Sequence, residues 1–317
     1  MGAFPSVSLP LPEVGVSILE YAAGPGREGL VGLDVLPIQN VSVKQGTYGI
    51  LPREAFTIIP ENVRKSDGSY NRVIWDFETA TYVAVEYGLE EILSDSDVAQ
   101  YASLFDYQST VATKLMMHHL MAQEVRIATL ALAGVSGASA FAKWDVAATA
   151  TPKADFDVAQ LAILTATGLE ADSVVIPKQA FSALLRTSEV KTALQYTQPV
   201  ETLAPDAQKR MVADYFGVKN VLVPSRFKSS ADKGQVFVGA SIWDKTKVLL
   251  FKAAESGQGL KQPCFGLSML WTSDSPDNAV TETYRDEARR ADVLRVRHNV
   301  DEVIVSAALG QTINTVL

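Results

Sequence analysis

The sequence predicts an α+β protein built from extended strand-rich segments, one long helix and a compact lobe. Strand-like runs broken by glycine and proline occupy residues 35–87. One helical pattern of about thirty residues follows, and α/β alternation then runs from residue 153 to residue 255. A length of 317 residues suits one elaborated domain or two lobes.

The composition narrows the function classes. Hydrophobic residues make up 47% and charged residues 20%, which is ordinary for a folded protein. A net charge of −8 argues against nucleic-acid binding through general electrostatics. The single cysteine, Cys264, excludes an intrachain disulfide and favours a reducing compartment. Neither a secretory start nor an apolar run of about 18 residues is found, so we expect a product made or assembled in a cytosol.

The first 92 residues predict extended structure. Residues 1–30, the N-terminal arm, are rich in proline and glycine, which oppose helix and interior strand. Composition leaves open whether this arm is a disordered tail or lies across a neighbouring subunit. Residues 31–92 read as an extended loop with flanking strands, with β segments at 35–38, 41–53 and within 69–87. A long two-stranded arm is only marginally stable alone in water, so we expect another subunit to cover it.

The long helix is expected over residues 101–133, within a segment 93–152 that ends in a connector of small residues. Asp95, Ser96 and Asp97 supply capping residues before the helix, and Gly134 follows its end. Such a helix is a rod of about 45 Å, which we interpret as a spine carrying sheet on one side. Its apolar stripe places His118 on the packed side and His119 toward solvent or sheet. The stripe comprises Leu104, Tyr107, Val111, Leu115, His118, Ala122, Val125 and Leu132.

The remainder predicts a lobe and a strand-rich return. Within residues 153–258 we expect alternating helices and strands, the helices at 158–165, 178–186 and from Pro205 to Phe216, and the strands at 173–177, 218–223, 235–238 and 247–251. Residues 259–300 become extended again, with strands at 264–271, 281–284 and 293–296. A last strand is expected at 303–305, within the C-terminal segment 301–317.

No catalytic constellation emerges from the sequence. Adjacent helical residues such as His118 and His119 point about 100° apart and cannot share a metal ion. Cys264 lies in no nucleophile motif, so we expect a buried apolar role for it. The Ser-x-x-Lys match at 188–191 lacks its companion Lys-Thr-Gly motif, and the glycine-rich run at 24–29 lacks the ending of a phosphate loop. We therefore expect no catalytic residue, no metal site and no cofactor.

Short motifs follow one another along residues 30–315 in a recognisable order. Val35-Leu36-Pro37 forms a turn before the run 41–48, which contains Lys-Gln and Gly-Thr-Tyr. The lobe carries Tyr-Phe-Gly-Val-Lys-Asn-Val-Leu-Val at 215–223, and Ile242-Trp243-Asp244 and Phe265-Gly266 come later. Together with the spine helix, this order resembles the major capsid protein of tailed double-stranded DNA bacteriophages, in particular the lambda capsid protein group.

The resemblance implies a Hong Kong 97-type fold. It would comprise an N-terminal arm, an extended β-hairpin loop, a peripheral domain with spine helix and sheet, and a compact α/β axial domain. In this chain the arm would be 1–30, the loop 31–92, the spine helix and connector 93–152, the axial domain 153–258, the peripheral sheet 259–300, and the C-terminal strand of the axial domain 301–317.

The resemblance also implies a structural subunit, not an enzyme, that self-assembles into the icosahedral head enclosing the double-stranded DNA of a tailed phage. The implied partners are copies of itself in hexamers and pentamers, a scaffolding protein, a portal, a decoration protein, and DNA packaged without sequence specificity; no membrane is implied. The short, proline-rich N-terminus argues against a fused scaffolding domain in the chain as given. The protein would be assembled in the host cytoplasm and reside in the virion capsid.

Candidate subunit-contact residues come from the loop and from the charged run 285–292. This run is either a solvated turn between two strands or a set of ion pairs across a subunit contact. Some relatives join subunits through a Lys–Asn isopeptide; Lys44 and Asn299 lie in corresponding regions, but no feature establishes the bond and we expect none. The candidates are the aromatic anchors Tyr48, Trp75, Phe77 and Tyr82, the basic loop residues Lys44, Arg53, Arg64 and Arg72, and Arg285, Arg289 and Arg290 of the charged run.

Two alternatives remain open from the sequence. An encapsulin-type shell protein would share the fold and enclose an enzyme cargo in place of a genome. A soluble α/β enzyme built on residues 153–255 would instead be a monomer or small oligomer with a pocket. Neighbouring terminase and portal genes would favour the phage, peroxidase or ferritin-like genes the encapsulin, and particle size would exclude the enzyme.

Overall fold

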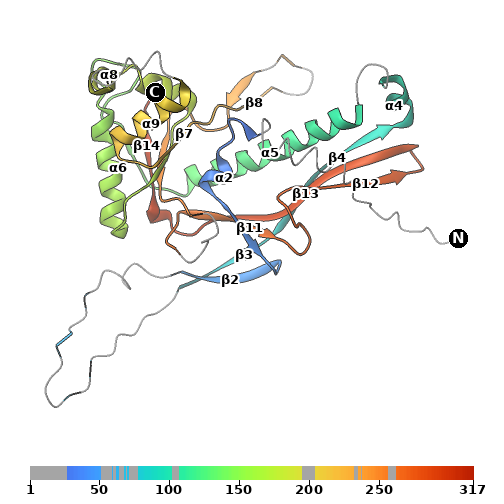
Figure 1. Ribbon diagram of the computed structural model, residues 1–317, viewed down its shortest axis with the longest axis horizontal. Helices are drawn as coiled ribbons and strands as arrows, with labels where there is room; N and C mark the ends of the chain where they lie inside the picture. The colour runs from blue at the N-terminus through green and yellow to red at the C-terminus, as the bar shows by residue number, and fades with distance from the viewer. Residues whose placement is uncertain are drawn as a thin grey trace.

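The computed structural model describes residues 27–50, 78–101, 107–194, 204–231, 238–255 and 262–317, and the short positions 59, 62–63, 68, 70 and 235–236. Figure 1 shows two parts: an elongated sheet with helix α5 along one face, and a compact lobe in which helices surround a second sheet. No helix among these residues is long and apolar enough to cross a membrane.

The elongated sheet is organised around β13 (Ala291–Ile304), a strand of 14 residues. One edge of β13 pairs with β11 (Gly266–Trp271) and then with β12 (Val280–Asp286), and its other edge pairs with β4 (Val85–Ser94). These pairs are antiparallel, whereas β1 (Ile38–Val41) joins β11 in parallel. A single continuous strand therefore holds the whole elongated part together.

The prediction of separate strands at 293–296 and 303–305 was wrong, because residues 293–296 and 303–304 all lie in β13, which ends at Ile304. The polar residues between them suggested a break. In the structure Arg297 has carboxylate partners on one face of the sheet and His298 lies buried beneath the other face. The strand continues because each of these polar side chains has a partner.

Helix α5 (Tyr107–Ala133) packs against this sheet, where Leu115 and Met116 share a core cluster with Leu294 and Val296 of β13. The predicted end before Gly134 is confirmed. The predicted start was wrong, because Tyr101 ends a separate helix, α4 (Asp95–Tyr101).

The predicted orientation of His118 on the packed side of α5 was wrong, whereas His119 faces the sheet, which was one of its two predicted positions. His119 is 2% exposed, whereas His118 faces solvent. The packed stripe shifts because it includes polar residues that have partners in the sheet and the lobe. Beyond Leu115 its buried members are Met116, His119, Leu120, Gln123, Glu124, Ile127, Ala128 and Ala131.

The lobe is built on a second sheet with the strand order β5-β14-β10-β6-β7. Its strands are β5 (Gly137–Ser139), β14 (Gly310–Asn314), β10 (Val248–Phe251), β6 (Ser173–Val175) and β7 (Asn220–Leu222). Its helices are α6 (Pro152–Thr167), α7 (Lys178–Leu184), α8 (Ser188–Leu194) and α9 (Pro205–Phe216). Proline begins α6 and α9, and Gly168 and Gly217 follow them with positive φ, as the sequence indicated for α9.

The lobe core is aromatic. The Phe156 and Phe216 rings stack with centroids 3.9 Å apart, and Trp144 stacks on Phe156 at 6.1 Å. Asp155, at the start of α6, accepts hydrogen bonds from the Phe141 amide and from Trp144 Nε1, both at 2.8 Å. This buried carboxylate therefore joins the segment before α6 to the helix.

Two further predictions concern the lobe strands. The strand that returns to the lobe at the C-terminus is β14, after the 3₁₀ turn η4 (Ala307–Leu309), and not residues 303–305. Of the predicted strand 235–238, residue 237 lies outside the described residues, and the prediction was wrong for residues 235, 236 and 238, which are in no strand. A short hairpin next to it pairs β8 (Phe227–Ser229) with β9 (Gly239–Ser241).

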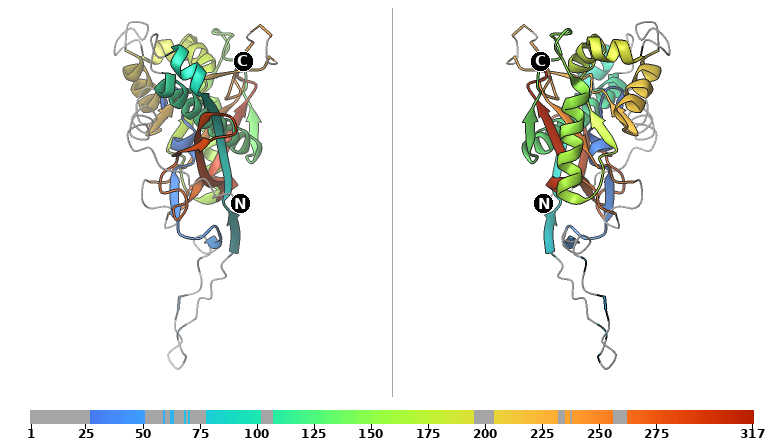
Figure 2. Two further views of the ribbon diagram at one scale, coloured as in Figure 1. Left: turned by 90° about the vertical axis from the view of Figure 1, so that its right-hand side faces the viewer. Right: turned by 90° about the vertical axis from the view of Figure 1, so that its left-hand side faces the viewer.

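The base of the predicted loop is a two-stranded ribbon of β2 (Gln45–Ile50) and β3 (Glu78–Val83). It lies below the lobe, at the end of the molecule opposite the tip formed by β4, β12 and β13 (Figures 1 and 2). Residues 51–58, 60–61, 64–67, 69 and 71–77 lie outside the described part of the chain.

Candidate subunit-contact surface

The ribbon β2–β3 is anchored to the elongated sheet at its base. Tyr48 and Tyr82 pack in a cluster with Cys264, Leu267 and Met269. Asp301 of β13 accepts a hydrogen bond from the Val83 amide at 2.8 Å, and partial burial raises the pKa of this carboxyl above its usual range. The ribbon therefore leaves the body in one defined direction.

This anchoring corrects two of the predicted contact residues. Tyr48 and Tyr82 are 7% and 6% exposed, so they hold the loop base and offer little area to a neighbour. Lys44 is exposed, and its Nζ lies 5.6 Å from the centroid of the Trp271 ring. The remaining loop candidates, Arg53, Arg64, Arg72, Trp75 and Phe77, lie outside the described residues.

Residues 287–290 of the charged run form an exposed turn between β12 and β13, as the first of its two readings expects, and ion pairs across a subunit contact stay a prediction. Arg285 donates to Asp95 at 2.7 Å and to Asp292 at 3.2 Å, and its guanidinium holds the pKa of Asp95 below its usual range. Arg289 pairs with Asp286 at 3.6 Å. Arg289 and Arg290 are exposed, so the tip still presents positive charge to solvent.

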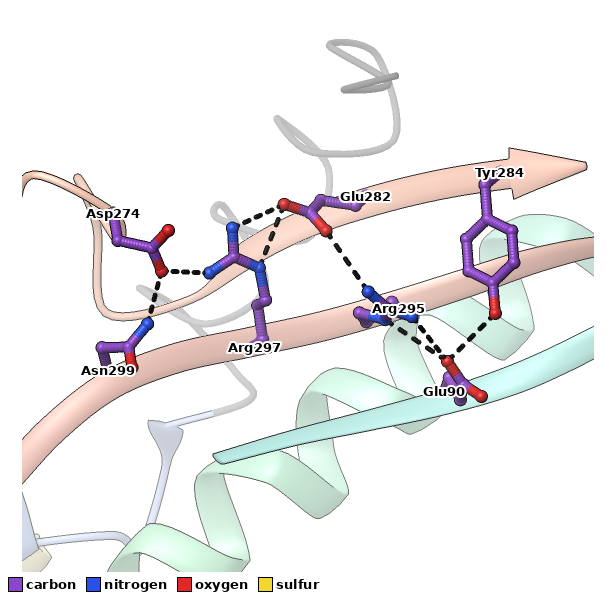
Figure 3. Close-up of polar contacts among 7 residues, drawn as sticks. All are labelled: Glu90, Asp274, Glu282, Tyr284, Arg295, Arg297 and Asn299. Carbon is purple, nitrogen blue, oxygen red and sulfur yellow. Dashed lines mark hydrogen bonds and ion pairs between the residues drawn. The ribbon is translucent and has the colours of Figure 1, made fainter. Parts of the chain in front are cut away.

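The sheet face opposite α5 carries a ladder of paired charges, shown in Figure 3. Arg295 lies 3.1 Å from Glu90 and 3.9 Å from Glu282. Arg297 donates to Glu282 at 2.7 Å and also contacts Asp274. Such a ladder fixes the side chains of this face without help from a second chain.

Asn299 continues the ladder at its inner end. It is 1% exposed, and its amide donates to Asp274 and to Ser275. The structure therefore places this asparagine inside the subunit, whereas Lys44 lies on the surface.

A buried polar cluster that was not predicted lies between α5 and β13. The His119 and His298 rings lie 4.1 Å apart between centroids, and Nε2 of His119 has no hydrogen-bond partner among the described residues. Arg126 lies beside them, donates to Glu302 at 2.8 Å and stacks 3.7 Å from the Tyr87 ring centroid. Three elements, α5, β13 and β4, therefore meet through titratable side chains.

The hydrogen bonds define the protonation of His298. Arg126 can only donate, so Nε2 of His298 accepts its hydrogen bond at 3.1 Å. Nδ1 of the same ring then carries the proton and donates to the Asn278 carbonyl at 2.9 Å. Burial, the neighbouring His119 and the Arg126 charge lower the pKa of His298 to about 3. Burial and Arg126 lower the pKa of His119 to about 4.

A second buried group, Glu124 of α5, joins the helix to the lobe. Its carboxylate accepts hydrogen bonds from the Val31 and Gly32 amides at 2.9 and 2.7 Å and from Trp243 Nε1 at 2.6 Å. Gly32 lies in α2 (Gly32–Val35), and a Cβ at this position would lie 2.6 Å from the carboxylate. Burial raises the pKa of Glu124, while the three donors oppose this shift.

The described residues offer little for catalysis. No group of three or more His, Cys, Asp or Glu side chains in that part of the chain could hold a metal ion. Burial raises the pKa of the Cys264 thiol to about 11, so it stays protonated and unreactive near neutral pH.

Comparison with solved structures identifies the fold. A phage-related protein from Bordetella bronchiseptica RB50 is similar over 98% of both chains, with a TM-score of 0.72 and 17% identity. A virus-like particle from Pyrococcus furiosus matches with a TM-score of 0.56 and 12% identity over 95% of this chain and 98% of that one. The capsid of cyanophage P-SCSP1u matches with a TM-score of 0.54 and 10% identity over 99% of this chain and 90% of that one. No family model and no curated protein sequence matches the chain.

These likenesses show that the chain has the α+β, Hong Kong 97-type fold of phage capsid proteins, which confirms the predicted fold class. The coverage extends over nearly the whole chain, so the elongated sheet, the spine helix and the lobe all take part in the match.

Proposed function

We propose that this chain is a structural, non-enzymatic subunit that self-assembles into the icosahedral head of a tailed phage and encloses its double-stranded DNA. The observation that carries the proposal is the likeness over nearly the full length of the chain to phage capsid structures. A ribbon that leaves the body from an anchored base supports it, because such a ribbon is suited to lie on a neighbour.

The proposed partners are further copies of the chain, arranged as hexamers and pentamers in a closed shell. A scaffolding protein, a portal, a decoration protein and packaged DNA would complete the head, which would assemble in the host cytoplasm. The net charge of −8 suits DNA held by confinement and not by a basic binding groove.

The direct test is particle formation by the purified full-length chain. Size-exclusion chromatography and negative-stain microscopy should show closed shells of megadalton size, whereas a stable monomer would contradict the proposal. Deletion of residues 52–76 with a short linker keeps β2 and β3 and removes the segment between them. The deleted chain should fold but not close shells; the control Tyr82→Phe, which keeps the buried ring, should assemble normally.

A virus-like particle without a phage genome is the second candidate, favoured by the likeness to the Pyrococcus furiosus particle. The two candidates differ in what surrounds the gene. Neighbouring terminase and portal genes support the phage head, whereas a neighbouring gene for an enzyme cargo supports an encapsulin-type shell without a phage genome.

A further inference from the structure

Helix α6 is apolar on nearly all sides, although only one side packs in the lobe. Phe156, Ala159 and Ile163 point inward and are at most 1% exposed. Val158 and Leu161 point outward and are 42% and 61% exposed. Helices that are apolar all round are buried in the finished structure. The outer side of α6 therefore requires a cover that the subunit does not supply among its described residues.

The outer side of α6 is shaped to receive an apolar side chain. A shallow hollow lies on it, lined by Val158, Leu161, Ala162, Thr165 and Ala166. The first four positions have the spacing i, i+3, i+4 and i+7, which is the arrangement that accepts a projecting side chain from a partner. Charged side chains are confined to the first turns of the helix, where Lys153 pairs with Asp157 at 3.1 Å.

A second exposed apolar surface lies on another side of the same lobe. Phe227 of β8 and Val238, just before β9, are 44% and 56% exposed. Beside them a hollow of about 490 Å³ is bounded by Leu132 of α5 and by residues 239–245. Asp244 and Lys245 line it, and the first turns of α6 likewise expose charges of both signs, Lys153 and Asp157. Figures 1 and 2 show α6 and the β8–β9 hairpin on different flanks of the lobe.

We infer that α6 of one subunit docks against the β8–β9 hairpin and the adjoining hollow of the next copy of this chain, head to tail. Ring contacts join two different surfaces of each subunit, and complementary surfaces on separate flanks allow a ring to close. A projecting apolar helix can pack on the exposed Phe227 and Val238 beside the hollow, and the mixed charges of the two surfaces can pair in opposite senses. The inference rests on the proposed function, because it identifies the contact within its rings of five or six.

Cysteine crosslinking of full-length particles tests this arrangement. The chain has one native cysteine, the buried Cys264, so introduced thiols give a clean readout. Particles of the double variant Leu161→Cys/Phe227→Cys should convert, with a short bismaleimide, from a monomer band to a ladder ending at five and six subunits. The matched control Leu161→Cys/Val98→Cys, whose second thiol lies on α4, should stay monomeric on the same gel.

Each outcome has a defined meaning. Intact particles of the double variant without a ladder would overturn the inference and leave the proposed function standing. Crosslinked dimers from Leu161→Cys alone would also overturn it, because they require α6 to face α6 of another copy. If the double variant does not assemble, Leu161→Glu is compared with wild type: loss of shells with an unchanged circular dichroism spectrum supports the contact, and normal shells contradict it. Absence of particles from the wild-type chain would instead overturn the proposed function.

Discussion

Acid should loosen the packing of α5 on the elongated sheet, because two buried neutral histidines lie at that contact. Protonation of His298 would oppose the Arg126 guanidinium, which already donates to its Nε2, and would crowd His119 at 4.1 Å. Glu302 faces the same cluster but is engaged by Arg126. The folded state therefore disfavours the charged imidazoles, and both pKa values lie below that of an unfolded histidine.

The sign and size follow from proton linkage. The stabilising contribution is fully present above the unfolded pKa of about 6.5 and is lost as the pH falls toward the folded pKa. At pH 5 an unfolded histidine is almost fully protonated, whereas His298, with a folded pKa of about 3, is not. The unfolding free energy should therefore fall by about 2 kcal/mol per histidine between pH 7.5 and pH 5, or by about 4 kcal/mol for the pair.

Urea unfolding of unassembled subunits at the two pH values measures this loss. In His298→Gln the term from that residue is absent, so the stability gap between wild type and variant should narrow by about 2 kcal/mol at pH 5. His118→Gln is the matched control because it removes an exposed histidine next to His119 on α5, so the fall of about 4 kcal/mol between the two pH values should remain. An equal pH dependence in wild type and His298→Gln would refute the assignment of neutral, buried histidines.

Three further predictions concern stability. Asp155→Ala should lower the unfolding free energy by about 2–4 kcal/mol because the buried Trp144 Nε1 and the part-buried Phe141 amide lose their acceptor. In thermal denaturation the exposed Asp157→Ala should change the unfolding free energy by less than about 1 kcal/mol, and similar losses from the two variants would contradict this. Glu124→Ala should lower the unfolding free energy by about 3 kcal/mol or more, since three buried donors lose their acceptor. An unchanged free energy in urea unfolding would contradict a stabilising role of Glu124 between α5 and the lobe. Gly217→Ala should lower the unfolding free energy by about 1 kcal/mol because φ is +72°, although its surroundings are open. Gly49→Ala, also in open space but without a positive φ, should lower it less. The reverse order in thermal denaturation would contradict this explanation.

Helix ends marked by proline or glycine could be predicted from the sequence. The end of α5 at Gly134 and the limits of α9 at Pro205 and Gly217 follow from local chemistry, and the structure has them there. The start of α5 and the face that it packs were not predicted correctly. Ala122 and Val125 continue the apolar pattern on one face, whereas the face that packs includes the polar residues His119 and Gln123. Only the partners in the sheet decide between the two faces.

The burial of the candidate contact residues also could not be predicted, because it depends on residues far away in the chain. Tyr48 and Tyr82 have the composition of contact residues, but their burial depends on Cys264, Leu267 and Met269, which follow some two hundred residues later. The pairing of His119 with His298 likewise joins residues far apart in the chain. The outer apolar side of α6 could have been predicted from the helical periodicity of the sequence. Val158, Leu161 and Leu164 lie on one side of a helix whose inner side is apolar as well.

The length of β13 has a consequence for how a shell could accommodate its subunits. Identical chains in a closed icosahedral lattice occupy positions of unequal curvature. A 14-residue strand that is paired on both edges over most of its length bends little, and Asp301 and Glu302 near its end connect the loop base and α5 to it. Conformational variation among subunits should then concentrate outside this strand and its pairings.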